Sequence, residues 1–112
     1  MRFVLHRHFT ENDHFDLMID DGGPLTTWRL NPEFRDNLRA SGQASCERIT
    51  DHRRDYLEYE GPTKSGSGRV EKHDSGKCII SGSEEDGLYC EFEGTILKGA
   101  YLIKGGYISL IK

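Results

Sequence analysis

The sequence predicts an all-β protein, a small antiparallel β-barrel with a short helical or loop insertion near residues 31–42. Short segments alternate between apolar and polar residues along most of the chain, which is typical of strands that bury one face. Glycine-containing turns separate these segments, and the 112 residues include 13 glycines but only three prolines. Many short strands at regular spacing favour a closed or nearly closed barrel. No repeat or linker marks a second domain, so residues 1–112 are expected to form one domain.

Three strands are predicted in the first part of the chain, at residues 3–8, 14–20 and 25–30. The second of them alternates most clearly between apolar and polar side chains. The turn residues Asp21-Gly22-Gly23 separate it from the third strand and indicate a hairpin. Pro24 is compatible with the start of a strand.

The insertion that follows has the signals of a short helix. Asn31 is a candidate N-cap, Pro32 suits the first helical position, and Gly42 can end the helix. Its apolar content is small, with Phe34 and Leu38 as the candidate buried residues. A partly ordered loop therefore stays open as an alternative.

The second half of the chain is predicted to be rich in strands. Turn signals at 74–76 and 105–106 separate several of them. A glycine-rich segment at 61–68 contains Lys64, but it lacks the Gly-x4-Gly-Lys-Ser/Thr pattern of a phosphate-binding loop and no helix follows it. We interpret it as a flexible connection. The strands are expected at residues 46–50, 69–73, 77–81, 88–93, 96–104 (with a kink near Gly99) and 107–111.

Charge and cysteine content narrow the classes of function. Nineteen acidic and fifteen basic residues give a net charge of −4, which argues against a general nucleic-acid coat but not against an enzyme that binds one phosphate locally. The three cysteines form no CxxC pair and are expected to be reduced thiols, with packing as the main role of Cys78 and Cys90. No apolar run is long enough for a membrane span, and no signal-peptide pattern opens the chain. We expect a cytoplasmic protein.

The first candidate site is a metal centre formed by His8, His14 and Asp16. In a strand, residues i and i+2 point to one face, so His14 and Asp16 project together while Phe15 and Leu17 point to the core. His8 can join them from the neighbouring strand across a short turn. Two imidazoles and one carboxylate form a plausible three-ligand set for Zn, Mn or Fe, with positions left for water or substrate. The alternative is an ordinary solvent-facing side of a strand.

The second candidate site is the polar run around residues 51–56. His52 and Tyr56 offer a proton donor and a phenol, and the guanidinium groups of Arg53 and Arg54 suit phosphate oxygens. A solvated loop with internal ion pairs is the alternative. Tyr56 and Tyr59 are three residues apart, so in a strand they would face opposite sides and at most one would line a site.

Together these residues resemble a known family. The order His8, His14-Phe15-Asp16 and Thr27-Trp28, followed by an Asp-His-x2-Asp-Tyr-x3-Glu-Gly run at 51–61 and a terminal strand at 97–103, is similar to the 3′-phosphoesterase domain of bacterial DNA ligase D. That domain processes DNA ends in non-homologous end joining. The resemblance extends over nearly the whole chain and suggests a divergent, stand-alone member.

The resemblance implies a β-barrel hydrolase that removes a 3′-terminal ribonucleoside and then a 3′-phosphate from DNA primer ends. A metal, typically Mn²⁺ (or another divalent ion such as Zn²⁺ or Co²⁺), would be bound by His8, His14 and Asp16. His52 and Tyr56 would be catalytic and would contact the phosphate. The expected partners are DNA 3′ ends or primer–templates, with separate ligase and polymerase chains as further candidates, and no membrane.

The sequence also departs from the family. Met18 stands where the family usually has an arginine, and Ala44 lies near a position where a basic residue is expected. Losing such a phosphate contact commonly lowers the rate by about 10² to 10³. A catalytically weakened or inactive module that binds DNA ends or a repair partner is therefore the alternative function. The arginines that can compensate are Arg29, Arg53, Arg54 and Arg69.

A weaker alternative is a cupin-like metal-binding barrel. His6 and His8, with Glu11 nearby, loosely resemble the His-x-His…Glu ligand set of cupins. The spacing fits poorly, and the glycine that should precede the motif is missing. Under this alternative His6 would be a metal ligand.

Overall fold

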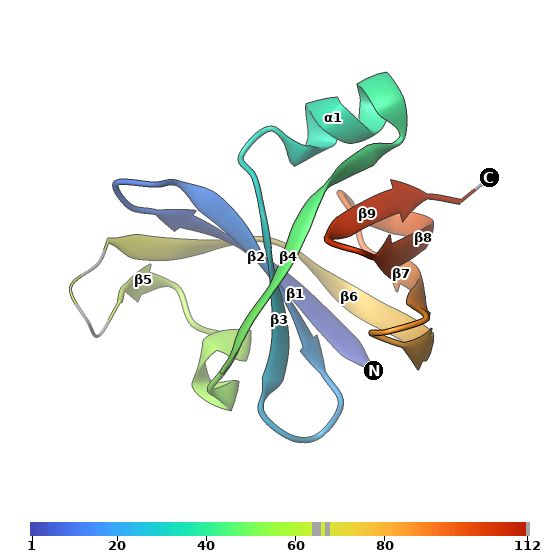
Figure 1. Cartoon of the computed structure of the whole chain (residues 1–112). Coiled ribbons are helices and arrows are strands. Elements are labelled where there is room, and N and C mark those ends of the chain that lie inside the picture. Colours follow the sequence, from blue (N-terminus) through green and yellow to red (C-terminus); the bar gives the residue numbers. More distant parts are fainter. Residues whose placement is uncertain (64–65, 67, 112) are drawn as a thin grey trace.

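The chain folds into a closed antiparallel β-barrel of eight strands, which confirms the fold class predicted from the sequence. The computed structural model describes residues 1–63, 66 and 68–111, so Lys64 of the glycine-rich segment lies outside the described residues. Neighbouring strands follow the order β1-β2-β3-β4-β9-β8-β7-β6, and β6 pairs with β1 to close the barrel (Figure 1). The strands are β1 (Arg2–Phe9), β2 (His14–Asp20), β3 (Leu25–Leu30), β4 (Gln43–His52), β5 (Gly61–Pro62), β6 (Arg69–Ser83), β7 (Gly87–Glu93), β8 (Lys98–Lys104) and β9 (Tyr107–Leu110).

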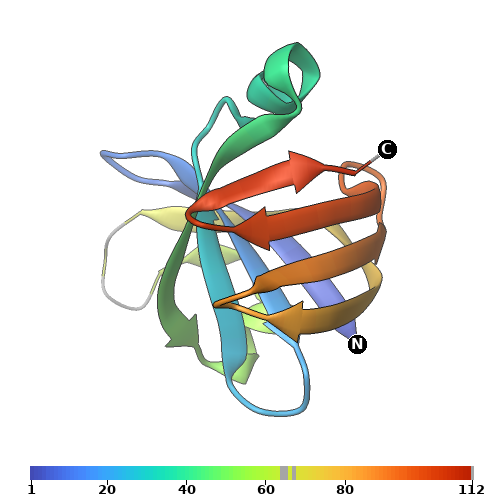
Figure 2. The ribbon, with the colours of Figure 1, turned by 45° about the vertical axis from the view of Figure 1, so that its right-hand side comes forward.

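Two long strands join the two halves of the barrel. The first part of β6 pairs with β1 and its second part pairs with β7, while β4 pairs with β3 along most of its length and with β9 only at its start. The short strand β5 pairs only with the first two residues of β6. Each long strand therefore belongs to both halves, and the sheet curves into a closed wall (Figure 2).

The turn predicted at residues 74–76 is wrong, because β6 continues through this segment. A register shift against β1, between Leu5 and His6, absorbs the irregularity. Asp74 is buried there, and its carboxylate accepts backbone N–H groups from the loop between β7 and β8. Gly76 allows close approach rather than a turn, since a Cβ atom at this position would lie 2.3 Å from the carbonyl oxygen of Glu93.

The insertion predicted near residues 31–42 contains the helix α1 (Phe34–Ser41), which lies over one end of the barrel (Figures 1 and 2). Its buried residues are Phe34 and Leu38, as predicted, and both join the main core. Gly42 ends the helix in the left-handed conformation, and its N–H donates to the carbonyl of Leu38. Asn31 is not the N-cap, because the helix starts later, after Glu33.

The main core fills the barrel with residues from both halves and from α1. It includes all three cysteines, which are free thiols. Burial raises the pKa of Cys46 and of Cys90 to about 12, so both thiols stay protonated near neutral pH. This agrees with a packing role. No helix in the described part of the chain is long and apolar enough to cross a membrane.

A second, smaller cluster lies on the opposite face of β1 and β2. It contains Val4, Met18, Leu25 and Leu57, with Tyr56 packed against it. Leu57 belongs to the 3-10 helix η1 (Arg54–Leu57), which follows β4 and returns over this wall. Both faces of β1 and β2 are therefore buried in places, and η1 leaves room for a cavity beside the cluster.

Candidate metal centre

The pairing of β1, β2 and β3 decides which polar side chains are neighbours. His8 is the pairing partner of His14, and His6 is the partner of Asp16, which in turn pairs with Arg29 on β3. Residues that pair directly across antiparallel strands have side chains on one face of the sheet. These five residues therefore lie on the wall face that carries the small apolar cluster.

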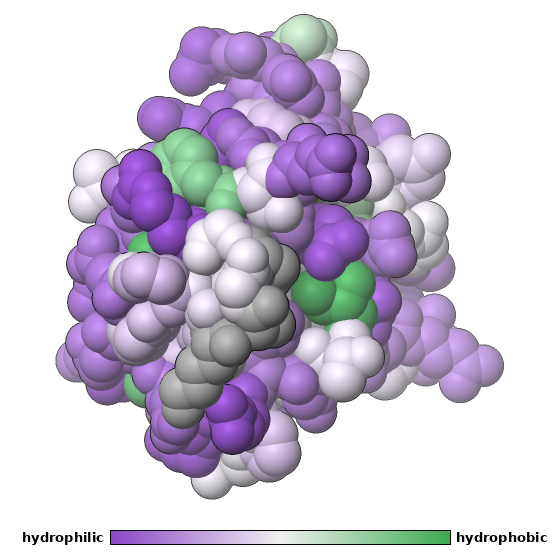
Figure 3. Space-filling model, turned by 90° about the vertical axis from the view of Figure 1, so that its left-hand side faces the viewer, coloured by the Kyte–Doolittle hydropathy of each residue, from purple (hydrophilic) through white to green (hydrophobic). Residues whose placement is uncertain are grey.

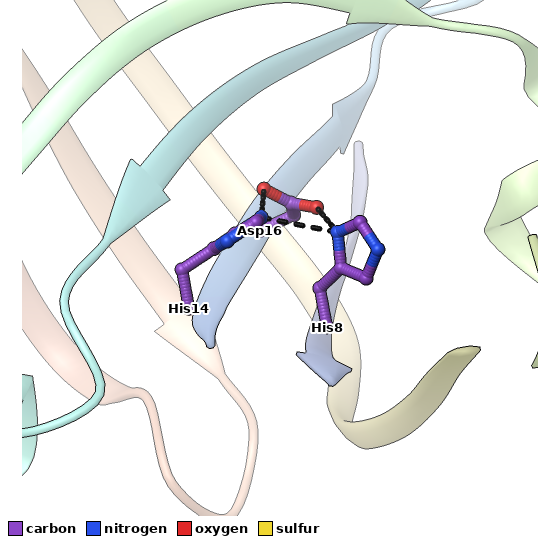
Figure 4. Close-up of side chains that lie close together, drawn as sticks. All are labelled: His8, His14 and Asp16. Carbon is purple, nitrogen blue, oxygen red and sulfur yellow. Dashed lines mark hydrogen bonds and ion pairs between the residues drawn. The ribbon is translucent and has the colours of Figure 1, made fainter. Parts of the chain in front are cut away.

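Three of these residues converge to form the predicted metal-ligating group (Figure 4). His8 Nδ1 lies 3.2 Å from His14 Nε2 and 3.9 Å from an oxygen of Asp16, and His14 Nε2 lies 3.3 Å from the other oxygen of that carboxylate. A metal bonded to each ligand at about 2.0–2.2 Å keeps adjacent ligand atoms about 3 Å apart. The donor set therefore fits a divalent cation. Three protein ligands would leave coordination positions for water or substrate.

His14 is oriented as a metal ligand should be. Its Nδ1 lies 2.9 Å from the backbone carbonyl of Asn12 and donates to it, so Nε2 carries the lone pair that faces His8 and Asp16. Once Nε2 is protonated it can donate to Asp16, and this raises the pKa of His14 above its ordinary value, although burial acts in the opposite direction. Asp16 is 3% exposed, so its negative charge acts in a poorly solvated place.

The second predicted group lies across Asp16 from the first. His52 Nε2 is 3.7 Å from Asp16 Oδ2, and the His52 ring contacts the ring of Tyr56. Both groups contribute side chains to one cavity of about 350 Å³, although His14 is not among its lining residues. The sequence-predicted residues that line it are His8, Asp16, His52, Arg53 and Tyr56.

The structure separates the two neighbouring arginines. Arg53 lines the cavity, and its guanidinium makes no ion pair with any residue that the structure describes. Arg54 is not among the lining residues, because its guanidinium binds Asp20 through two nitrogens and also donates to the carbonyl of Gly23. The predicted phosphate contacts at residues 53 and 54 therefore reduce to one candidate.

Tyr56 and Tyr59 do not follow the strand geometry considered for them. Residues 54–57 form a 3-10 helix, and the two tyrosine rings contact each other edge to face with centroids 5.7 Å apart. Tyr59 follows just after the end of this helix, and the chain reversal at η1 brings its ring against that of Tyr56. Tyr56 lines the cavity, and Tyr59 is not among its lining residues.

His6 is a site residue that the sequence reasoning assigned only to the cupin-like alternative. It lines the same cavity, is 1% exposed, and burial lowers its pKa to about 4, so it is neutral near pH 7. The alternation that pairs His14 with Asp16 also places His6 on the face of His8, and this was the available signal. Glu11, the third cupin-like ligand, is exposed in the β1–β2 turn, and the converging group found among the described residues does not include it.

Met18, which stands where the family resemblance expects an arginine, is fully buried in the small apolar cluster.

The side of the molecule toward which the β1–β2 hairpin projects is mainly hydrophilic, with small hydrophobic areas (Figure 3). Fold and site together define a small β-barrel with a candidate metal centre on its wall. No protein-family model matches the sequence, and no curated protein matches it either.

Proposed function

We propose that this protein is a divalent-metal-dependent phosphoesterase that processes 3′ ends of DNA during repair by non-homologous end joining. The observation that carries the proposal is a cavity where two groups meet: His8 and Asp16, which converge with His14, and the pair of His52 and Tyr56. The order of these residues along the chain also resembles the ligase D phosphoesterase domain. The products would be 3′-hydroxyl ends that separate polymerase and ligase chains can use.

The triad would bind Mn²⁺, with Zn²⁺ or Co²⁺ as alternatives, because two imidazoles and a carboxylate suit these ions. When bound, such a metal polarises a phosphoryl oxygen and lowers the pKa of bound water. The hydrogen bond from Nδ1 to the Asn12 carbonyl holds the His14 ring in the orientation that metal binding requires. Binding requires neutral imidazoles, so any proton on His8 or His14 leaves when the metal binds.

In this proposal His52 is the proton donor. Its Nδ1 lies 3.2 Å from the carbonyl of Thr50 and donates to it, which turns Nε2 toward Asp16 and the cavity. In its protonated form Nε2 can give a proton to the oxygen that leaves the phosphate. The Tyr56 hydroxyl can donate to a non-bridging oxygen, and the guanidinium of Arg53 can neutralise phosphate charge. These three groups form the phosphate side of the site.

The direct test uses a primer–template whose primer carries a 3′-phosphate, and a second one that ends in a single ribonucleotide. With Mn²⁺ we expect conversion to a 3′-hydroxyl end, and we expect His52→Ala to lower the rate by about 10² or more. His73→Ala is the matched control, because His73 is exposed and does not line the cavity. The proposal is wrong if both primers stay intact while Mn²⁺ is shown to bind.

The burial of Met18 favours a second candidate, a catalytically weakened module that binds DNA ends or a repair partner. Met18 is apolar and fully buried in the small cluster, so this position does not supply the expected phosphate contact. Under this alternative the metal-loaded protein would bind 3′-phosphate DNA without converting it. A binding titration alongside the cleavage assay separates the two functions.

A further inference from the structure

A second hollow lies on the other side of the metal-ligating triad. This groove, of about 260 Å³, is lined by His14, Arg29, Asn31 and Glu47 among others, whereas His8 and Asp16 line the first cavity. The triad therefore stands between two hollows.

Among the arginines that can replace the missing family contact, two are engaged elsewhere. Arg54 is held by Asp20, and Arg69 forms an ion pair with Glu71 while its guanidinium stacks 4.5 Å from the ring of Phe9. The remaining two line the hollows, Arg53 the cavity and Arg29 the groove. Neither makes a hydrogen bond or ion pair through its guanidinium with any residue that the structure describes.

The strand register explains why Arg29 is available when residue 18 is not. Met18 pairs with Thr27 on β3, and η1 covers Met18 through Leu57. Arg29 is two residues further along β3, opposite Asp16, and it is exposed. Directly paired residues have Cβ atoms about 4.5–5.5 Å apart, so the long arginine side chain starts next to the triad.

Three other polar side chains of the groove bear on its ligand, those of Asp13, Asn31 and Glu47. Asp13 is already used, since its carboxylate accepts the backbone N–H of Thr10 and pairs with Arg7. The side-chain oxygen of Asn31 is buried and accepts no hydrogen bond within the described part of the chain. Glu47 on β4 is the strand-pairing partner of Arg29 on β3, and its negative charge repels an anion in the groove.

We propose that Arg29 is a second anion contact of this site and that the groove binds the sugar–phosphate unit next to the reacting phosphate. The preferred ligand is then a nucleic-acid 3′ end with two consecutive phosphates, rather than an isolated phosphomonoester. This inference rests on the proposed phosphoesterase function. Arg53 contacts the reacting phosphate in the cavity, and Arg29 contacts the neighbouring phosphate in the groove.

The experiment compares two substrates with Mn²⁺: a deoxydinucleotide 3′-phosphate, which has two consecutive phosphates, and a deoxynucleoside 3′-monophosphate, which has one. We expect Arg29→Gln to lower kcat/KM for the dinucleotide about tenfold or more and to leave the mononucleotide value unchanged. Glu47→Gln should shift the dinucleotide value in the opposite direction. Arg35→Gln, a change at an exposed arginine on α1 outside both hollows, is the matched control.

An unchanged dinucleotide-to-mononucleotide ratio in Arg29→Gln overturns the inference, and so does an equal loss for both substrates. If the unmodified protein converts neither these substrates nor the 3′-phosphate primer, the proposed function fails instead. The inference is then tested by titrating the Mn²⁺-loaded protein with a fluorescently labelled dinucleotide. Weaker binding to Arg29→Gln, and not to Arg35→Gln, supports the groove, whereas equal binding rejects it.

Discussion

The substitution Asp16→Asn tests the metal centre most directly, because it keeps the shape of the side chain and removes its charge. Asp16 supplies the only carboxylate among the three converging ligands and lies 3.3 Å from His14 and 3.9 Å from His8. Without it, two neutral imidazoles remain. We expect the variant to fold and to lose most of the stabilisation that a divalent metal gives to the unmodified protein.

The size of the effect follows from mass action. A metal present at 100 times its dissociation constant stabilises the folded state by about 2.7 kcal/mol. Changing a partner of a metal ligand weakens metal binding about 10- to 100-fold, and loss of the carboxylate ligand itself should reach at least the upper figure. The same metal concentration then stabilises Asp16→Asn by about 0.4 kcal/mol or less, a difference of about 2.3 kcal/mol.

Urea unfolding at pH 8, with EDTA or with Mn²⁺, measures this difference. For a urea m-value of about 1–3 kcal/mol per molar, the metal-induced shift of the midpoint should be about 1–2 M larger in the unmodified protein. Asp36→Asn is the control, because Asp36 is exposed on α1 and forms an ion pair with Arg39 on the same helix. Equal metal-induced shifts in the unmodified protein and Asp16→Asn would refute the assignment of the triad.

Three further predictions concern stability without metal. In the folded state the pKa of His6 is lowered from 6.5 to about 4, so neutral His6 stabilises the fold in full above pH 6.5. As the pH falls to about 4, the free energy of unfolding of the unmodified protein should drop by about 3 kcal/mol relative to that of His6→Gln. Parallel pH profiles of urea unfolding for the two proteins would contradict this. Asp74→Ala should lower the free energy of unfolding by about 3 kcal/mol or more, because four backbone N–H groups lose their acceptor. A loss below about 1 kcal/mol in urea unfolding would show that water replaces the carboxylate. Met18→Arg should destabilise the fold by about 3–5 kcal/mol rather than increase activity, because it places an unpaired charge in an apolar cluster. A stable variant that removes 3′-phosphates faster would disprove this reasoning.

The sequence by itself determined which side chains share a face of a strand. Alternation along residues 14–20 predicts that His14 and Asp16 project together, and the hairpin spacing predicts that His8 joins them. The structure brings these three residues together. This part was predictable because strand alternation and a tight hairpin are local properties, set by residues close in the chain.

Only the tertiary structure decided what covers that face and what approaches it from elsewhere. His52 reaches Asp16 because β4 runs beside β3, with His52 opposite Leu25, and η1 then turns back over the wall. The same turn directs Arg53 to the cavity and Arg54 to Asp20, although the two are neighbours in the sequence. Such arrangements depend on contacts between distant segments, and the alternation within one strand carries no information about them.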